Sequence, residues 1–507
     1  MRLERSKNAK RNSIWGFISN FITILLPFLV RTILIEELGA QYLGLSSLFT
    51  SILTVLNITE LGFGTAIVYM MYKPLAEDDT DLLCALLNYY RKIYRMIGIV
   101  ILTAGLVIIP FLDRLIKGTV PEDINIYILY VMYLLNTSLS YWLFAYKASI
   151  LTIYQRNDIK SKIGIFTSSM LYIGQAVVVI LTHSYYAYVA VLLCITVLNN
   201  IVPAIYVKKY YPQYICKGDI SADLRKDIRT RLTGLMITKI SAVSRNAFDS
   251  IIVSAFLGLV MVGIYNNYFY IINSVSAMML VLTNAIAAGI GNSIAYDSTE
   301  KNLQDMRIIN FWYMWISAWF MSCLVGLFQP FMRLWVGEKL MFSDSIMMAF
   351  ALYFFVQKIG DIQAQYFDAA GLWWYRKWYS VSEVIANFIL NLVLGYFFGV
   401  FGIVIATILT IVFINFLGAS SIIFKHYFKK GFRRYIADQL KWLTTATVVS
   451  VIIYFITVSF RLGNGLFDLI TKGLICTVIP NCIILLFYFR SKLFKTAYSW
   501  LVARLRK

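Results

Sequence analysis

Charged residues are scarce in this sequence. Asp, Glu, Lys and Arg make up only 14% of its 507 residues, whereas a soluble domain has roughly 25%. Hydrophobic residues make up 60% of the chain, and its mean hydropathy is +0.71. A folded chain of this composition does not have enough polar side chains to cover a water-exposed surface. The sequence therefore predicts an all-α integral membrane protein and excludes a soluble enzyme.

Histidine and cysteine are also rare, with two and six residues. No CxxC motif and no Cys/His metal spacing occurs, so we expect no metal and no cofactor. His183 lies in a tight turn and His426 in a basic loop, and neither has an obvious catalytic partner. The longest loop, 208–231, is too short for a catalytic domain. A membrane polymerase, ligase or acyltransferase is thus disfavoured, and we predict that the chain is not an enzyme.

Apolar runs recur along the whole chain. About 20 such residues cross a bilayer as a helix, whereas barrel strands would alternate over about ten residues, a pattern that is missing. We predict about fourteen transmembrane helices, at 14–35, 42–71, 94–112, 125–146, 163–182, 186–207, 232–256, 263–290, 310–332, 346–370, 378–398, 400–424, 440–460 and 466–489.

The positive charges fall mainly on one side of these predicted spans. With the N-terminus in the cytoplasm, 36 of the 46 Lys and Arg residues lie on the cytoplasmic side and five on the other side. This is the positive-inside pattern of a multi-pass protein of the cytoplasmic membrane, with both termini in the cytoplasm. The net charge of +20 is then explained by topology and by anionic membrane lipids. We expect no nucleic-acid partner.

Short motifs repeat at an offset of about 220 residues. "LGAQYLGL" from Leu38 matches "LGLVMVGI" from Leu257, and "PFLDRL" from Pro110 matches "PFMRLW" from Pro330. Tyr146 likewise matches Tyr366. Chance similarity in a biased composition is the alternative. The repeat predicts two six-helix halves related by a pseudo-twofold axis along the membrane normal, as in transporters. The expected parts are an N-terminal lobe (1–207), a basic linker (208–231), a C-terminal lobe (232–424) and two additional helices with a basic tail (425–507).

The stretch "VQKIGDIQAQYFDAAG" places charges inside an apolar run. On one helix, Lys358, Asp361, Gln365 and Asp368 fall within about 80° of arc. A charge that faces lipid is costly, so this stripe is expected to face protein or a hydrated cavity. The alternative is a helix-packing seam in which Lys358 pairs with Asp361.

Polar residues occur in other predicted spans as well. Glu383, Asn387 and Asn391 follow at spacings of four, and Arg245 can pair with Asp249. Polar stripes in both halves favour a shared hydrated cavity. Its positive and negative charges are nearly balanced, so they do not indicate which cargo it binds. The remaining polar residues of this kind are Arg31, Asn57, Glu60, Lys239, Asn266, Asn273, Asn284 and Lys472.

The opening of the chain resembles a known family. The stretch from "GFISNFITILLPFLVRTILIEELGAQYLGLSSLF" to "PLAEDD" looks like the start of bacterial O-antigen (Wzx-type) polysaccharide flippases, and "DSIIVSAFLGLVMVGIYNNYFYIINSV" resembles the start of their second half. These proteins belong to the multidrug/oligosaccharidyl-lipid/polysaccharide exporter superfamily. The resemblance implies a V-shaped fold like that of multidrug and toxin extrusion transporters.

The resemblance also implies a function. Such flippases move undecaprenyl-diphosphate-linked oligosaccharide to the outer leaflet by ion-coupled alternating access, for O-antigen, capsule or exopolysaccharide assembly, and a polysaccharide polymerase and chain-length machinery are their expected partners. The alternatives are a lipid II flippase or a multidrug/cation antiporter of the same superfamily. By this resemblance, the cargo would contact Arg31, Lys239, Arg245, Lys358, Gln365 and Asn387. The coupling ion, H⁺ or Na⁺, would bind among Glu60, Asp249, Asp361, Asp368 and Glu383.

Overall fold

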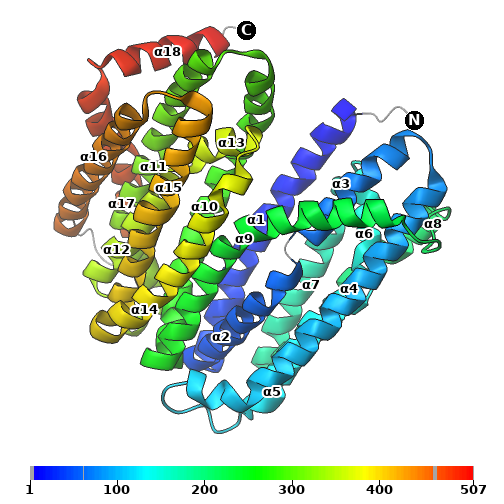
Figure 1. The fold of residues 1–507 in the computed structure, drawn as a ribbon. Coiled ribbons are helices and arrows are strands. Elements are labelled where there is room, and N and C mark those ends of the chain that lie inside the picture. The colour runs from blue at the N-terminus through cyan, green and yellow to red at the C-terminus, as the bar shows by residue number, and fades with distance from the viewer. Residues whose placement is uncertain (1–4, 61, 461–464, 506–507) are drawn as a thin grey trace. The chain divides into compact units, whose positions relative to one another are not determined.

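The computed structural model describes residues 5–60, 62–460 and 465–505, and every regular element among them is a helix (Figure 1). Contacts between residues divide the chain into unit 1, Met1–Gly263, and unit 2, Ile264–Lys507. Each unit is described by itself. The predicted lobes 1–207 and 232–424 stay a prediction.

Unit 1 packs long helices around a core of Leu, Ile and Tyr side chains. α9 belongs to it because α9 packs against α2 and α3. Its elements are α1 (Arg5–Glu37), α2 (Ala40–Leu56), η1 (Asn57–Glu60), α3 (Phe63–Ala76), α4 (Thr80–Ile108), η2 (Ile109–Leu115), α5 (Ile126–Trp142), η3 (Ala145–Lys147), α6 (Ala148–Ile153), α7 (Asn157–Thr182), α8 (Tyr185–Tyr210), α9 (Ala222–Leu257) and the first turn of α10 (Leu259–Tyr296).

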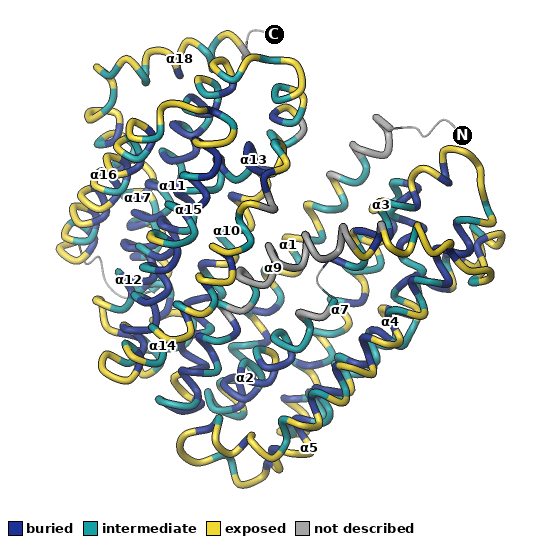
Figure 2. The backbone as a smooth tube through the Cα atoms, viewed as in Figure 1, coloured by how far each residue is buried: buried dark blue, intermediate teal, exposed yellow. Residues whose placement is uncertain are grey.

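Unit 2 is built around α11 and α12, whose dark blue segments in Figure 2 mark buried residues. α11 packs against α12, α16, α17 and α18. After the rest of α10, the elements of unit 2 are α11 (Thr299–Val336), η4 (Glu338–Leu340), α12 (Asp344–Lys358), α13 (Asp361–Ala369), α14 (Trp373–Thr410), η5 (Ile411–Phe416), α15 (Leu417–Ile423), η6 (Phe424–Phe428), α16 (Phe432–Ser459), α17 (Leu466–Tyr488) and α18 (Lys492–Leu505).

The number of predicted spans is not confirmed. Among the described residues, ten helices are long and apolar enough to cross a membrane, or eleven if the bent pair α5 and α6 forms one span. The difference from fourteen has two causes: some apolar runs break into shorter helices, and two predicted spans are counted as one. The run 42–71 breaks into α2, η1 and α3. The predicted spans 378–398 and 400–424 lie in one continuous helical stretch, Tyr375–Phe428, which is kinked at Gly399 with a non-helical φ of 58° and ψ of −139°. The predicted span 232–256 lies in α9, where Ala247–Leu257 is a shorter apolar helix.

The glycines of the repeated motifs "LGAQYLGL" and "LGLVMVGI" serve tight turns and close approach in unit 1. Gly39 and Gly258 have φ of 113° and 91° just before α2 and α10 begin, a backbone region that disfavours other residues. A Cβ on Gly44 would lie 2.1 Å from the carbonyl oxygen of Leu259, and one on Gly263 would lie 2.9 Å from that of Ala40. The starts of α2 and α10 therefore touch backbone to backbone.

Each unit also contains a broken helix at the place where the repeat aligns the two halves. α5 is followed by α6 after a bend of 43°, and α12 is followed by α13 after Ile359 and Gly360. Tyr146 and Tyr366, which the repeat pairs, both follow these breaks and are buried. The breaks matter because helix ends bring unpaired backbone groups and polar side chains into the interior.

Candidate functional site

The break between α12 and α13 holds a charged pair. Lys358 ends α12 and Asp361 begins α13, so the predicted stripe does not lie on one uninterrupted helix. Lys358 Nζ lies 3.4 Å from Asp361 Oδ2, and these side chains are 9% and 32% exposed. The pairing that the sequence offered as the alternative is thus present. Gln365 is half-buried and Asp368 is exposed on α13.

Tyrosines and amides surround this break. The Tyr313 hydroxyl of α11 donates to Asp361 Oδ2 at 2.5 Å, and the Tyr435 hydroxyl of α16 approaches the Ile359 carbonyl at 3.5 Å. Ser420 donates to Gln363, which is 1% exposed, at 2.7 Å. These tyrosines were not among the predicted site residues, because a tyrosine in an aromatic-rich helix gives no local signal. Asp361 therefore pairs with the Lys358 cation and accepts a hydrogen bond from the Tyr313 hydroxyl, and its side chain is still partly exposed.

The stripe on α14 is confirmed as one buried face. Asn415 Nδ2 donates to Glu383 Oε2 at 2.6 Å, and Asn387 Nδ2 donates to Thr407 Oγ1 at 3.1 Å. Asn391 donates to Asn387 at 3.2 Å, and the three stripe residues are at most 1% exposed. The face packs against the part of the chain that follows the kink at Gly399. Its known partners are protein side chains, so the contacts fit helix packing, and the binding roles of Glu383 and Asn387 stay predictions.

In unit 1, Glu60 lies at the break between α2 and α3. The Tyr94 hydroxyl donates to Glu60 Oε1 at 2.8 Å, and Tyr90 donates to Tyr94 at 3.0 Å. The Tyr141 hydroxyl lies 3.4 Å from Asn57 Oδ1, and its ring meets that of Tyr94 edge to face. Both units thus place a carboxylate at a helix break and a tyrosine of a neighbouring long helix on it.

The other predicted residues lie on separate helices. Arg31 is half-buried on α1, close enough to Tyr172 and Tyr188 to interact electrostatically. On α9, Arg245 is half-buried and Asp249 is 1% exposed. The side chain of Lys239 lies outside the described residues. These cations are in unit 1 and Lys358 is in unit 2, so their common binding of one cargo stays a prediction.

The remaining predicted polar residues are three asparagines on α10 and Lys472 on α17. Asn266 is half-buried, and Asn273 and Asn284 are exposed. Lys472 pairs with Asp468 at 2.8 Å, and the two side chains are only 7% and 9% exposed. This second Lys–Asp pair is more enclosed than the pair at the α12–α13 break.

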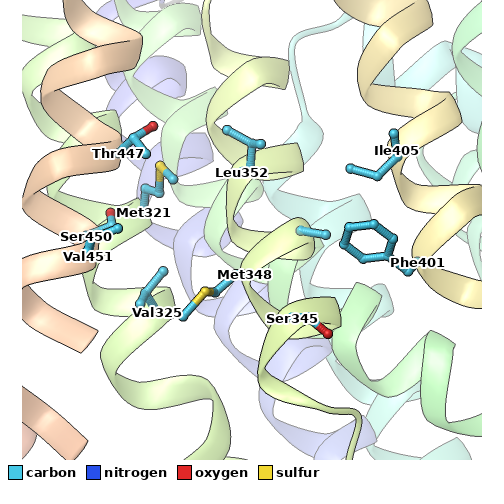
Figure 3. A pocket seen from close by; sticks show the side chains of 11 residues that line it. Met321, Val325, Ser345, Met348, Leu352, Phe401, Ile405, Thr447, Ser450 and Val451 are labelled. Carbon is cyan, nitrogen blue, oxygen red and sulfur yellow. The ribbon is translucent and has the colours of Figure 1, made fainter. Parts of the chain in front are cut away.

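An apolar cavity of about 240 Å³ lies in unit 2 among α11, α12, α14 and α16 (Figure 3). None of the predicted site residues lines it. Its walls include Met321, Met348, Leu352 and Phe401. The hydroxyl of Thr447 in the wall is already bonded to the Leu443 carbonyl. The cavity therefore suits hydrocarbon rather than a sugar or a diphosphate.

Comparison with known proteins identifies the class. The family model described as "Polysaccharide biosynthesis protein" matches residues 9–273, more than half of the chain. The chain therefore belongs to this family of polysaccharide biosynthesis proteins. No curated protein matches the sequence.

Solved structures show the same fold. The lipid II flippase MurJ in an inward closed conformation has a TM-score of 0.66 and 17% sequence identity, over 94% of this chain and 98% of that chain. An inward-facing multidrug resistance MATE family transporter of the MOP superfamily has a TM-score of 0.59 and 14% sequence identity, over 82% of this chain and 96% of that chain. A MOP superfamily transporter from Pyrococcus furiosus has a TM-score of 0.54 and 16% sequence identity, over 84% of this chain and 97% of that chain. The chain thus has the all-helical, multi-pass membrane fold of these proteins.

Proposed function

We propose that this protein is a transporter that moves undecaprenyl-diphosphate-linked oligosaccharide from the inner to the outer leaflet of the bacterial cytoplasmic membrane. It would do so by ion-coupled alternating access and supply O-antigen, capsule or exopolysaccharide assembly. The family match supports a cargo of polysaccharide biosynthesis. The resemblance of the opening sequence to Wzx-type flippases supports a lipid-linked oligosaccharide in particular.

The observation that carries the proposal is the charged pair at the α12–α13 break. Lys358 is almost fully buried, and an ionised side chain inside a membrane protein is costly unless it serves a hydrated pathway or a partner. Asp361, its partner, is 32% exposed. A diphosphate that reaches this break can replace Asp361 as the counterion of Lys358, because phosphate oxygens accept charge-assisted hydrogen bonds.

The carboxylates supply candidate sites for the coupling ion. When a diphosphate takes Lys358, Asp361 keeps only the hydroxyl of Tyr313 among its described polar contacts and favours a proton or Na⁺. Glu60 in unit 1 has the corresponding arrangement with Tyr94. We propose these two carboxylates as the first positions to test for coupling, ahead of Glu383, whose carboxylate is held by Asn415.

The test uses purified protein in proteoliposomes with a labelled undecaprenyl-diphosphate oligosaccharide. Transfer is followed as the fraction of label that an added glycosidase can reach. We expect transfer by the wild type, and a rate roughly tenfold lower for Lys358→Ala, which corresponds to about 1.4 kcal/mol. Lys358→Arg keeps the charge and should restore much of the rate.

Lys472→Ala is the matched control, because it also removes the cation of a buried Lys–Asp pair but lies on α17. Both variants are assayed at a temperature at which thermal unfolding shows them to be folded, and equal losses there would mean that Lys358 is only structural. If several glycan lipids are not transferred while the same vesicles export cationic dyes, the oligosaccharide assignment is wrong and the chain is a cation exporter.

A further inference from the structure

A second cavity of unit 2, of about 320 Å³, lies where α11, α16 and the C-terminal helix α18 meet. Its charged lining comes from Glu300 and Arg307 near the start of α11, Arg434 on α16 and Lys492 at the start of α18. Leu303 and Leu493 add apolar surface. The cavity is thus cationic on one part of its wall and apolar on another.

The carboxylates at this cavity are already neutralised. Glu300 pairs with Lys430 at 2.8 Å, and Arg307 pairs with Asp438 at 2.7 Å. Arg434 and Lys492 are exposed, and in the described part of the chain no ion pair joins either of them to a carboxylate. Two cations at the cavity are therefore left to attract an anion.

α18 (Lys492–Leu505) is a short helix with an apolar side and a basic side. Figure 1 shows it across the ends of the long helices of unit 2. Ala497 is fully buried, and its carbonyl accepts from Trp312 Nε1 at 3.3 Å. The Phe494 ring stacks on Trp315 of α11. Lys492 and Lys495 remain exposed. The apolar side of α18 thus packs on α11, and its exposed lysines can contact anionic headgroups.

The depth of the cavity fits this interface. Its α11 lining, Glu300 to Ile308, comes from the first turns of a helix that is long and apolar enough to cross a membrane. Trp312 and Trp315 follow one and two turns later, and Trp is enriched at the level of lipid headgroups. The cavity is therefore at the end of the spanning helices, where headgroups lie, and not in the middle of the bilayer.

We propose that this cavity binds the phosphate headgroup of an anionic membrane lipid. Arg434 and Lys492 would donate charge-assisted hydrogen bonds to the phosphate oxygens, while Leu303 and Leu493 would contact the glycerol and the upper acyl chain. The bound lipid would hold α18 against α11 and α16. This site differs from the proposed transport site and does not depend on what cargo the protein carries.

Native mass spectrometry of the full chain in detergent tests the proposal. Phosphatidylglycerol and phosphatidylcholine are titrated separately onto the wild type and onto the double variant Arg434→Gln/Lys492→Gln. The wild type should bind phosphatidylglycerol roughly 10-fold more tightly than phosphatidylcholine, an effect of the size expected for basic side chains near anionic lipid. The double variant should lose most of this preference, and Arg434→Lys should keep it.

The control variant Lys208→Gln/Lys209→Gln removes two exposed cations in the last turn of α8 and should keep the preference. An equal loss in this control would show that net charge, and not the cavity, selects the lipid, and would overturn the proposal. So would an unchanged preference in the double variant. Competition by inorganic phosphate at the same concentration as the lipid would assign the site to free phosphate instead. Thermal unfolding of each variant identifies any that fails to fold.

Discussion

At the scale of single residues, the ion pairs of this protein range from enclosed to exposed. Lys472 and Asp468 are both less than a tenth exposed, whereas Lys92 and Asp219 are 55% and 67% exposed. The enclosed pair depends on both partners, since neither charge can turn to water. The exposed pair is solvated with or without its partner. The two pairs should therefore respond differently to the same kind of substitution.

We predict that Lys472→Met lowers protein stability by about 3–5 kcal/mol, the usual cost of removing one member of a buried ion pair. Adding Asp468→Asn should recover most of the loss, because the remaining side chain is then neutral. Thermal unfolding in detergent measures both variants. A single variant as stable as the wild type would mean that Asp468 has another counterion.

For the exposed pair, Lys92 and Asp219, we predict an effect on the titration of the carboxyl group. The hydrogen bond from Lys92 lowers the pKa of Asp219 below its usual value. A carboxyl group with a lowered pKa stabilises the fold above its unfolded pKa, and this contribution is lost as the pH falls through the folded value. Carbon NMR of labelled aspartate should show a low midpoint for Asp219 that rises in Lys92→Gln. A midpoint unaffected by this substitution would contradict the assignment.

At the scale of elements, backbone contact between α2 and α10 leaves no room for side chains. We predict that Gly44→Ala destabilises unit 1 by about 1–3 kcal/mol, the typical cost of overpacking, because its Cβ would lie 2.1 Å from a backbone oxygen. Gly16→Ala is the matched control on α1, where an added Cβ meets nothing within 4 Å. Thermal unfolding compares the two. If both variants unfold at the wild-type temperature, the helices separate more readily than this contact implies.

The elements also show what the sequence predicts and what it does not. The single buried face of Glu383, Asn387 and Asn391 follows from spacing alone, since it depends on local helix geometry. The breaks after α2 and α12 do not, because apolar runs continue through them. Their polar groups are satisfied by Tyr94 and Tyr313, which are distant in sequence. Only the fold brings such partners together.

At the scale of the whole molecule, both the proposed direction of transport and the proposed lipid site depend on how the chain is oriented in the membrane. The bias of Lys and Arg predicts that α18 and the C-terminus are cytoplasmic. The lipid site then faces the inner leaflet, which is the leaflet from which the proposed cargo departs. A reversed orientation would place Arg434 and Lys492 outside the cell.

Reporter fusions decide the orientation. We predict that green fluorescent protein fused after Lys507 fluoresces and that alkaline phosphatase at the same position is inactive, because the first folds in the cytoplasm and the second only outside it. Phosphatase inserted at Gly118, in the connection between η2 and α5, should be active and serves as the control. An active phosphatase at Lys507 with an inactive one at Gly118 would invert the topology. The cationic cavity would then lie at the outer leaflet, and the direction of transport proposed from the family would have to be measured anew in right-side-out vesicles.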